Sequence, residues 1–204
     1  MILVKICGVT TVEDAVLAAE LGASAIGLVF WPGSPRFVEV RQAREIVAAL
    51  PPLVSAIGVF VNQAEHAAQV AREVGLSAVQ FHGDEPPGSY VAYPARVIKA
   101  IAVRDDSAED AAAAVPSGVT VLLDAHDPVR RGGTGQLIDW SISGKIARQR
   151  RVILSGGLTA ENAVEAVAAV APYAIDVSSG VERVAGRKDP AKLRALFAAL
   201  RTGL

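Results

Sequence analysis

Several short apolar runs in this sequence end at a residue that can exchange a proton. Cys7 follows the first run, His82 the fourth and Asp124 the sixth, while Asp176 lies inside the eighth. Thiol, imidazole and carboxyl groups are common general acids and bases of enzymes. If the runs are parallel strands of one barrel, their carboxyl ends meet at one mouth, which is where such barrels carry active sites. The pattern therefore predicts an acid–base site built from several strands.

Cys7 is the only cysteine, and a lone cysteine is most often a small buried apolar residue. Lys5 lies two residues earlier and so points to the same face of a strand. An ammonium group beside a thiol lowers the thiol pKa from its ordinary value of about 8.5. We therefore predict that Cys7 acts as a base in its thiolate form.

The position of Asp124 leaves two interpretations open. A carboxyl group at the mouth of a barrel can act as a general acid. The same residue could instead cap the loop that follows the run of Val121, Leu122 and Leu123.

Glycine and serine segments follow the seventh and eighth runs. Their exposed backbone N–H groups can surround a phosphate, helped by the N-terminus of a following helix. Loops after the last two strands are also the usual phosphate site of (β/α)8 barrels. Simple tight turns are the alternative interpretation. The predicted phosphate-binding residues are Gly156, Gly157, Ser178, Ser179 and Gly180.

Arg36 lies in the loop after the second run, where its guanidinium can bind a carboxylate through two parallel hydrogen bonds. A solvated loop arginine is the alternative. The glycine-rich segment 132–135 after the sixth run is a candidate lid over the mouth. Arg148, Arg150 and Arg151 form a basic cluster that we interpret as structural, because cations suit the carboxyl end of a helix.

The eight apolar runs are the strands that must position these residues. They cover residues 2–6, 25–30, 54–61, 78–81, 96–101, 120–123, 152–154 and 174–177. Alanine-rich segments with apolar residues at helical spacing separate them, as at Leu193, Leu196, Phe197 and Leu200. Dividing 204 residues by eight gives about 25 per unit, which suits a strand, a helix and two short loops. We predict a single-domain (β/α)8 TIM barrel of near-minimal length over residues 1–204.

An open doubly wound sheet is the main alternative fold. The chain has no Gly-x-Gly-x-x-Gly after its first run, which argues against a dinucleotide-binding version. Helix boundary signals agree with repeated strand–helix units. Thr10 with Glu13 predicts a capping box, and Asp189 predicts an N-cap followed by proline. Gly22 and Gly75 predict helix ends.

Composition limits the functions that the chain can have. Lysine and arginine number 20 against 21 aspartate and glutamate, so the net charge of -1 favours neither nucleic acid nor an anionic membrane as a partner. The apolar stretches are shorter than the ~20 residues of a membrane-spanning helix. A lone cysteine cannot form an internal disulfide, and the three scattered histidines lack zinc-ligand spacing. We therefore predict a protein without a bound metal. Because the opening residues have no signal-peptide cleavage site, we also predict that the protein is cytoplasmic.

Eight short motifs occur in order along the chain. They are Lys5-Ile6-Cys7-Gly8, Ser34-Pro35-Arg36, Gly58-Val59-Phe60-Val61-Asn62, Gln80-Phe81-His82-Gly83, Leu122-Leu123-Asp124, Gly132-Gly133-Thr134-Gly135, Leu154-Ser155-Gly156-Gly157-Leu158 and Asp176-Val177-Ser178-Ser179-Gly180-Val181-Glu182. In this order they resemble the motifs of the phosphoribosylanthranilate isomerase family. The similarity extends from about Val4 to Asp189.

This resemblance implies a cofactor-free Amadori rearrangement in tryptophan biosynthesis. The family converts N-(5-phosphoribosyl)anthranilate, a phosphorylated aminosugar, into 1-(2-carboxyphenylamino)-1-deoxyribulose 5-phosphate. By resemblance, Asp124 protonates the ring oxygen of the furanose, and Cys7 removes the proton from C2 of the resulting Schiff base. Arg36 is then the contact to the anthranilate carboxylate, and the glycine and serine loops bind the phosphate. His82 and Asp176 match positions that line the site.

Two other functions stay open on the sequence alone. A related isomerase of histidine biosynthesis opens a similar aminoaldose but resembles a two-carboxylate, two-phosphate design, whereas Cys7 follows the first run here. A non-catalytic sugar-phosphate-binding barrel would need only the phosphate loops. The presence of both Cys7 and Asp124 favours catalysis. We expect either a monomer or a homodimer.

Overall fold

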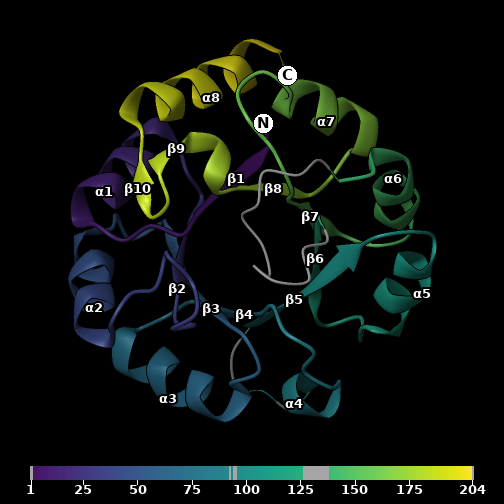
Figure 1. Cartoon of the computed structure of the whole chain (residues 1–204), viewed down its shortest axis with the longest axis horizontal. Coiled ribbons are helices and arrows are strands. Elements are labelled where there is room, and N and C mark those ends of the chain that lie inside the picture. Colours follow the sequence, from purple (N-terminus) through teal and green to yellow (C-terminus); the bar gives the residue numbers. More distant parts are fainter. Residues whose placement is uncertain (1, 92, 94–95, 126–137, 204) are drawn as a thin grey trace.

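Eight parallel strands close into a barrel in the computed structural model, which describes residues 2–91, 93, 96–125 and 138–203. Each strand is hydrogen-bonded to the next one along the chain, and the eighth pairs with the first (Figure 1). The strands are β1 (Leu3–Cys7), β2 (Ala25–Val29), β3 (Ser55–Phe60), β4 (Ala78–Phe81), β5 (Arg96–Val103), β6 (Thr120–Ala125), β7 (Val152–Leu154) and β8 (Ala174–Val177). The closed barrel confirms the predicted fold and excludes the open sheet.

All eight predicted strands are present, and β4, β7 and β8 have the predicted boundaries. The fifth and sixth strands extend two residues beyond their predicted ends, to Val103 and Ala125. Asp124 therefore lies within β6, contrary to the expectation that it follows the strand. Its register partner in β5 is Ala102. A paired strand thus holds the backbone of this carboxyl-bearing residue.

A helix follows each strand, and the helices surround the barrel (Figure 1). They are α1 (Val12–Leu21), α2 (Val40–Ala49), α3 (Ala64–Val74), α4 (Gly88–Val91), α5 (Ser107–Ala114), α6 (Trp140–Gln149), α7 (Ala163–Val170) and α8 (Pro190–Gly203). The fourth is a single turn, whereas α8 has 14 residues. The apolar positions predicted to share one face of α8 are all buried, namely Leu193, Leu196, Phe197 and Leu200.

Three predicted helix boundaries are confirmed. Gly22 and Gly75 end α1 and α3 in the left-handed conformation, with φ angles of 113° and 79°. That conformation favours glycine because glycine has no Cβ. Asp189 precedes α8, and its carboxylate accepts hydrogen bonds from two backbone N–H groups of the first turn.

The predicted capping box at Thr10 is wrong by one residue. Thr11 is the N-cap of α1, and its side chain accepts a hydrogen bond from the backbone N–H of Asp14. The Thr10 hydroxyl instead donates to the carbonyl of Gly186 at 2.5 Å. This contact joins the start of α1 to a segment far along the chain, which no local pattern indicates.

Alternation along the strands fills the barrel with two layers of side chains. The first layer is apolar and comes from seven strands; it consists of Ala25, Ile57, Ala78, Ile98, Leu122, Ile153 and Ala174. Two residues further along three of these strands, the same face carries Gln80, Asp124 and Asp176, all buried. Apolar packing therefore closes the barrel interior below a polar layer at the carboxyl ends of the strands.

A small antiparallel hairpin between β8 and α8 was not predicted. After the 3₁₀ turn Ser179–Val181, strands β9 (Glu182–Val184) and β10 (Arg187–Lys188) pair with each other. The backbone N–H of Lys188 donates to the Asp14 carboxylate of α1 at 3.0 Å. The hairpin is thereby attached to the barrel beside the carboxyl end of β1.

Candidate active site

One cavity opens at the carboxyl ends of the barrel strands. It is lined by Cys7, Val29, Trp31, Ser34, Arg36, Val59, Val61, Gln80, His82, Asp124, Ser155, Asp176 and Ser178. The predicted catalytic residues Cys7 and Asp124 are both among them, and so are the residues predicted to bind the substrate, Arg36, His82 and Asp176. Of the predicted phosphate-binding residues, Ser178 is also among them. The barrel thus brings together side chains from both ends of the chain.

Cys7 is the last residue of β1, and its side chain is buried. Gly27 in β2 makes room for it, because a Cβ there would lie 2.8 Å from the Cys7 Sγ and 3.1 Å from the Lys5 Nζ. Lys5 therefore lies on the same side of β1 as Cys7, as predicted. Its ammonium forms a buried ion pair with Asp176 at 2.9 Å.

The predicted lowering of the Cys7 pKa is wrong. Burial raises the pKa of the Cys7 thiol, the Asp176 carboxylate raises it further, and the Lys5 ammonium opposes them only in part. Burial also disfavours the charged form of Lys5, but Asp176 and Cys7 together outweigh burial and raise the Lys5 pKa. Because the Lys5 ammonium is paired with the Asp176 carboxylate, it lowers the pKa of the thiol less than an unpaired ammonium would.

Asp124 faces His82, whose Nε2 lies 3.2 Å from one carboxylate oxygen. The other oxygen accepts a hydrogen bond from the backbone N–H of Ala125 at 2.9 Å. On the opposite side of the imidazole, the Gln80 side-chain nitrogen lies 2.9 Å from Nδ1. With this nitrogen donating to Nδ1, the ring carries its proton on Nε2 and donates it to Asp124. Gln80, His82 and Asp124 thus form a line of hydrogen bonds at the cavity wall.

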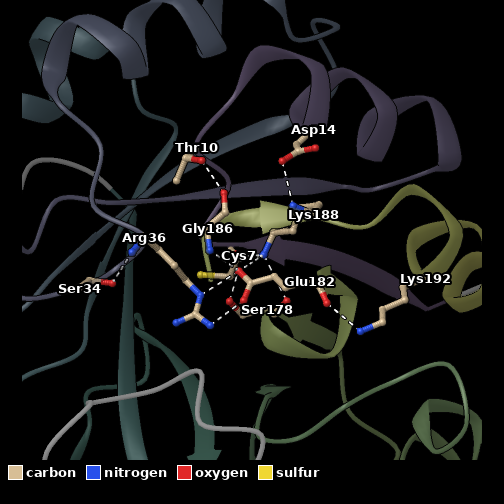
Figure 2. Close-up of polar contacts among 10 residues, drawn as sticks. All are labelled: Cys7, Thr10, Asp14, Ser34, Arg36, Ser178, Glu182, Gly186, Lys188 and Lys192. Atoms are coloured by element: carbon tan, nitrogen blue, oxygen red, sulfur yellow. Dashed lines mark hydrogen bonds and ion pairs between the residues drawn. The ribbon is translucent and has the colours of Figure 1, made fainter. Parts of the chain in front are cut away.

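Arg36 lies in the loop after β2, as predicted, and lines the cavity. Its guanidinium donates to both carboxylate oxygens of Glu182 in β9, from Nε at 2.9 Å and from Nη2 at 2.7 Å (Figure 2). Burial alone would raise the pKa of Glu182, but Arg36 and Lys188 outweigh burial and lower it, so the carboxylate is ionised. The guanidinium is therefore oriented by the protein itself.

The loops after β7 and β8 pack directly against each other. Gly156 and Gly157 have positive φ angles of 92° and 64°, a region that favours glycine. Gly180 lies against the carbonyl of Leu158, where there is no room for a Cβ. This close approach brings the two predicted phosphate-binding segments side by side.

The Ser178 hydroxyl is already used within the protein. It donates to the carbonyl of Cys7 at 3.0 Å and so links the ends of β8 and β1. A hydroxyl has one proton to donate. While this contact is intact, Ser178 can offer a phosphate only its backbone N–H, which narrows the role predicted for it.

Sequence reasoning missed three buried polar residues around the site. Gln80 lies two residues before His82 on the inward face of β4, a signal that strand alternation could have revealed. Glu182 is the last residue of the eighth motif, but its type and position predict no role for it. Lys188 gave no signal at all, because a basic hairpin residue is typical of a solvated surface.

Other predicted features lie away from the cavity. Arg150 donates to the carbonyls of Val115 and Val119, each at 2.8 Å, which confirms a structural role for this member of the basic cluster. The candidate lid 132–135 lies outside the described residues. Within the ranges that the structure describes, no group of three or more histidine, cysteine, aspartate or glutamate residues could hold a metal ion. In the same ranges, no helix is both long and apolar enough to cross a membrane.

The family model for N-(5'-phosphoribosyl)anthranilate (PRA) isomerase matches residues 4–199. The chain belongs to the PRA isomerase family. An N-(5'-phosphoribosyl)anthranilate isomerase from Citrifermentans bemidjiense is 47% identical over 197 residues, which cover 96% of this chain and 95% of the relative.

Two crystal structures of PRA isomerases are similar over nearly their whole length. The first is in complex with reduced 1-(o-carboxyphenylamino)-1-deoxyribulose 5-phosphate; it has 39% identity and a TM-score of 0.88, with 99% of this chain and 100% of that chain covered. The second, from Thermotoga maritima, contains mutually generated monomers of a dimeric PRA isomerase, with 37% identity, a TM-score of 0.88 and the same coverage. Membership in the PRA isomerase family confirms the predicted isomerase of tryptophan biosynthesis.

Proposed function

We propose that this chain converts N-(5-phosphoribosyl)anthranilate into 1-(2-carboxyphenylamino)-1-deoxyribulose 5-phosphate, with Asp124 as the general acid and Cys7 as the general base. The supporting observation is the shared cavity, which these two side chains line from β6 and β1. An acid and a base on different strands can act on different atoms of one bound substrate.

Substrate binding uses the two ends of the molecule. We assign the phosphate to the backbone N–H groups of Gly156, Gly157, Ser179 and Gly180, together with that of Ser178. The packed loops after β7 and β8 support this assignment, because they bring these segments together. We assign the anthranilate carboxylate to Arg36, which lines the same cavity and is oriented by Glu182. Asp176 and His82 act on other protein groups. Asp176 forms the ion pair with Lys5, and His82 donates a hydrogen bond to Asp124.

Ring opening starts at Asp124. Its protonated carboxyl gives a proton to the furanose oxygen as the bond from C1 to that oxygen breaks, and the nitrogen lone pair forms the C=N bond of a protonated Schiff base. The carboxylate left behind accepts the hydrogen bond from His82, which stabilises its new charge.

Proton abstraction follows at Cys7. The thiolate removes the proton from C2, and the electron pair of that bond forms the C1=C2 bond while the C=N electrons return to nitrogen. The resulting enol becomes the ketone as C1 gains a proton and the hydroxyl group on C2 loses its proton. The Lys5 ammonium stabilises the thiolate, whose raised pKa makes it a stronger base but a less populated one near neutral pH.

The test is a direct assay of the purified chain with N-(5-phosphoribosyl)anthranilate. NMR follows the reaction, because isomerisation does not change the mass. We expect conversion without added metal or cofactor and a slower reaction when C2 carries deuterium. Binding without conversion would overturn the proposal in favour of a sugar-phosphate-binding barrel.

We further propose that residues 1–204 act as one cytoplasmic domain that binds no nucleic acid and works as a monomer or homodimer. The balanced charge supports the absence of a nucleic-acid partner. Sedimentation velocity over a range of concentrations distinguishes the two oligomeric states.

A further inference from the structure

A lysine behind the cavity is the most deeply buried cation in the site's surroundings. Lys188 is in β10, and its side chain is 0% exposed. No step of the proposed reaction uses it. We propose that Lys188 is a positioning residue that holds Cys7 and Arg36 in fixed relation to each other. This inference rests on the roles proposed above for those two residues.

Three acceptors surround the Lys188 ammonium (Figure 2). It donates to the carbonyl of Cys7 at 2.6 Å, to the carbonyl of Ser178 at 3.2 Å and to the Glu182 carboxylate at 2.9 Å. An ammonium has three N–H donors, so each donor has one acceptor. Lys188 therefore joins the ends of β1 and β8 to the first residue of β9.

Glu182 continues this connection to Arg36. Its Oε1 accepts from the Lys188 Nζ, from the Arg36 Nε and from the backbone N–H of Gly186, while its Oε2 accepts from the Arg36 Nη2. The bidentate contact fixes the plane of the guanidinium as well as its place. A continuous set of hydrogen bonds thus runs from the backbone of the proposed base to the proposed carboxylate-binding residue.

The backbone of the hairpin does not depend on the Lys188 side chain. The backbone N–H of Lys188 donates to the Asp14 carboxylate, and the carbonyl of Gly186 accepts from the Thr10 hydroxyl. These contacts attach the hairpin to α1, through Asp14, and to the residue Thr10 just before that helix. A substitution that removes only the ammonium therefore leaves these attachments in place.

Stability alone gives a weak reason for such a buried pair. Replacing both partners of a buried ion pair by uncharged groups is often neutral, whereas removing one partner leaves a costly unpaired charge. Burial also lowers the pKa of Lys188, while Glu182 opposes this change. An apolar side chain at position 188 could not make the three contacts that fix this geometry.

The test compares four variants of the full chain. Lys188→Met removes the ammonium, and Glu182→Gln removes the carboxylate charge. Lys188→Met leaves Glu182 in its ion pair with Arg36, and the double variant Lys188→Met/Glu182→Gln serves if Lys188→Met alone does not fold. Lys192→Met is the matched control, since its Nζ donates to the backbone carbonyl of Glu182 at 2.7 Å.

Three readouts separate positioning from folding. For Lys188→Met, in which Glu182 keeps Arg36 as its partner, we expect a Tm close to that of the wild type, with kcat at least about tenfold lower and KM raised, because small displacements of reacting groups cost ~100-fold. Inorganic phosphate, used as a competitive inhibitor, should lose affinity by a smaller factor than kcat falls. The pH midpoint for alkylation of Cys7, the only thiol, should move to higher pH. Lys192→Met should match the wild type in all three.

Wild-type kcat, KM and alkylation profile in a folded Lys188→Met or double variant would overturn the proposal. An equal loss of phosphate affinity would do the same, because it would indicate general damage to the site. If the wild type itself does not convert the substrate, the proposed function fails. The alkylation profiles, which need no substrate, then still show whether Lys188 acts on Cys7.

Discussion

The two groups proposed to move protons have very different neighbours. Beside Cys7 lie two ammonium groups, those of Lys5 and Lys188, each paired with a buried carboxylate. Asp124 instead contacts the backbone N–H of Ala125 and the imidazole of His82. Buried ion pairs therefore surround the base, and a line of hydrogen bonds leads to the acid.

This difference indicates which side of the cavity can rearrange. Breaking a buried ion pair leaves an uncompensated charge, so the base side is held in one geometry. On the acid side, the Gln80 amide oxygen has no hydrogen-bond partner among the described residues. The Gln80 amide can therefore flip, exchanging the places of its nitrogen and oxygen, as the imidazole proton of His82 moves from Nε2 to Nδ1. We expect substitutions to have abrupt effects at the base and graded effects along the line to the acid.

The largest effect is expected for Cys7→Ala. The change removes the proposed base and only a small side chain, so kcat should fall by ~10²- to 10⁴-fold while the protein stays folded. Stopped assays with purified variant measure the loss, and titration with a product analogue checks that binding persists. Turnover equal to that of the wild type would exclude Cys7 from the reaction.

A similar but smaller loss is expected for Asp124→Asn, at least ~10²-fold in kcat. Asparagine keeps the size of the side chain and can still accept from the Ala125 N–H, but it has no carboxyl proton to deliver. Substrate binding should remain measurable, so the loss should appear in kcat more than in KM. A variant with the activity of the wild type would require another proton donor, beginning with His82 and Asp176.

The fold follows from local patterns, and so do most residues of the cavity. Strand alternation and helix boundary residues predicted the barrel, and the residues at the ends of the strands predicted its mouth. Asp124 was placed beyond its strand because a charged residue after an apolar run is typical of a loop. In a barrel interior, the polar layer continues the strand, as it does at Asp124 and Asp176.

The contacts that set the chemistry were beyond the reach of sequence patterns. Arg36 and Glu182 are 146 positions apart, and the Lys188 contact to Cys7 spans 181 positions. The direction of the thiol pKa shift depends on burial and on the competition of Asp176 for Lys5. Both are properties of the assembled barrel and not of neighbours along the chain.

The pH dependence of Cys7 alkylation tests the base side without substitution. The thiolate is the reactive form, and the Cys7 pKa is raised above the ordinary value of a thiol. The reactive fraction should therefore grow with pH, and the rate of Cys7 alkylation, which does not need a protonated Asp124, should rise about tenfold per pH unit below that pKa. Rates measured from neutral pH upward, with Tm recorded at each pH, check this expectation. A plateau below about pH 8.5, the ordinary pKa of a thiol, would mean that Lys5 and Lys188 together outweigh burial.

The smallest effect is expected on the acid side, for Gln80→Leu. Leucine has a similar volume but cannot donate to the imidazole Nδ1, so the histidine loses the contact that keeps its proton on Nε2. One neutral hydrogen bond is worth about 0.5–1.5 kcal/mol, which corresponds to a roughly two- to tenfold decrease in kcat. The NMR shifts of the His82 ring nitrogens report the tautomer directly, and Lys192→Met again serves as the control. If Gln80→Leu lowered kcat as severely as Asp124→Asn, the acid side would be as rigid as the base side, and the contrast between them would be lost. If kcat and the tautomer both stayed unchanged, the contact to Asp124 alone would be sufficient to orient His82.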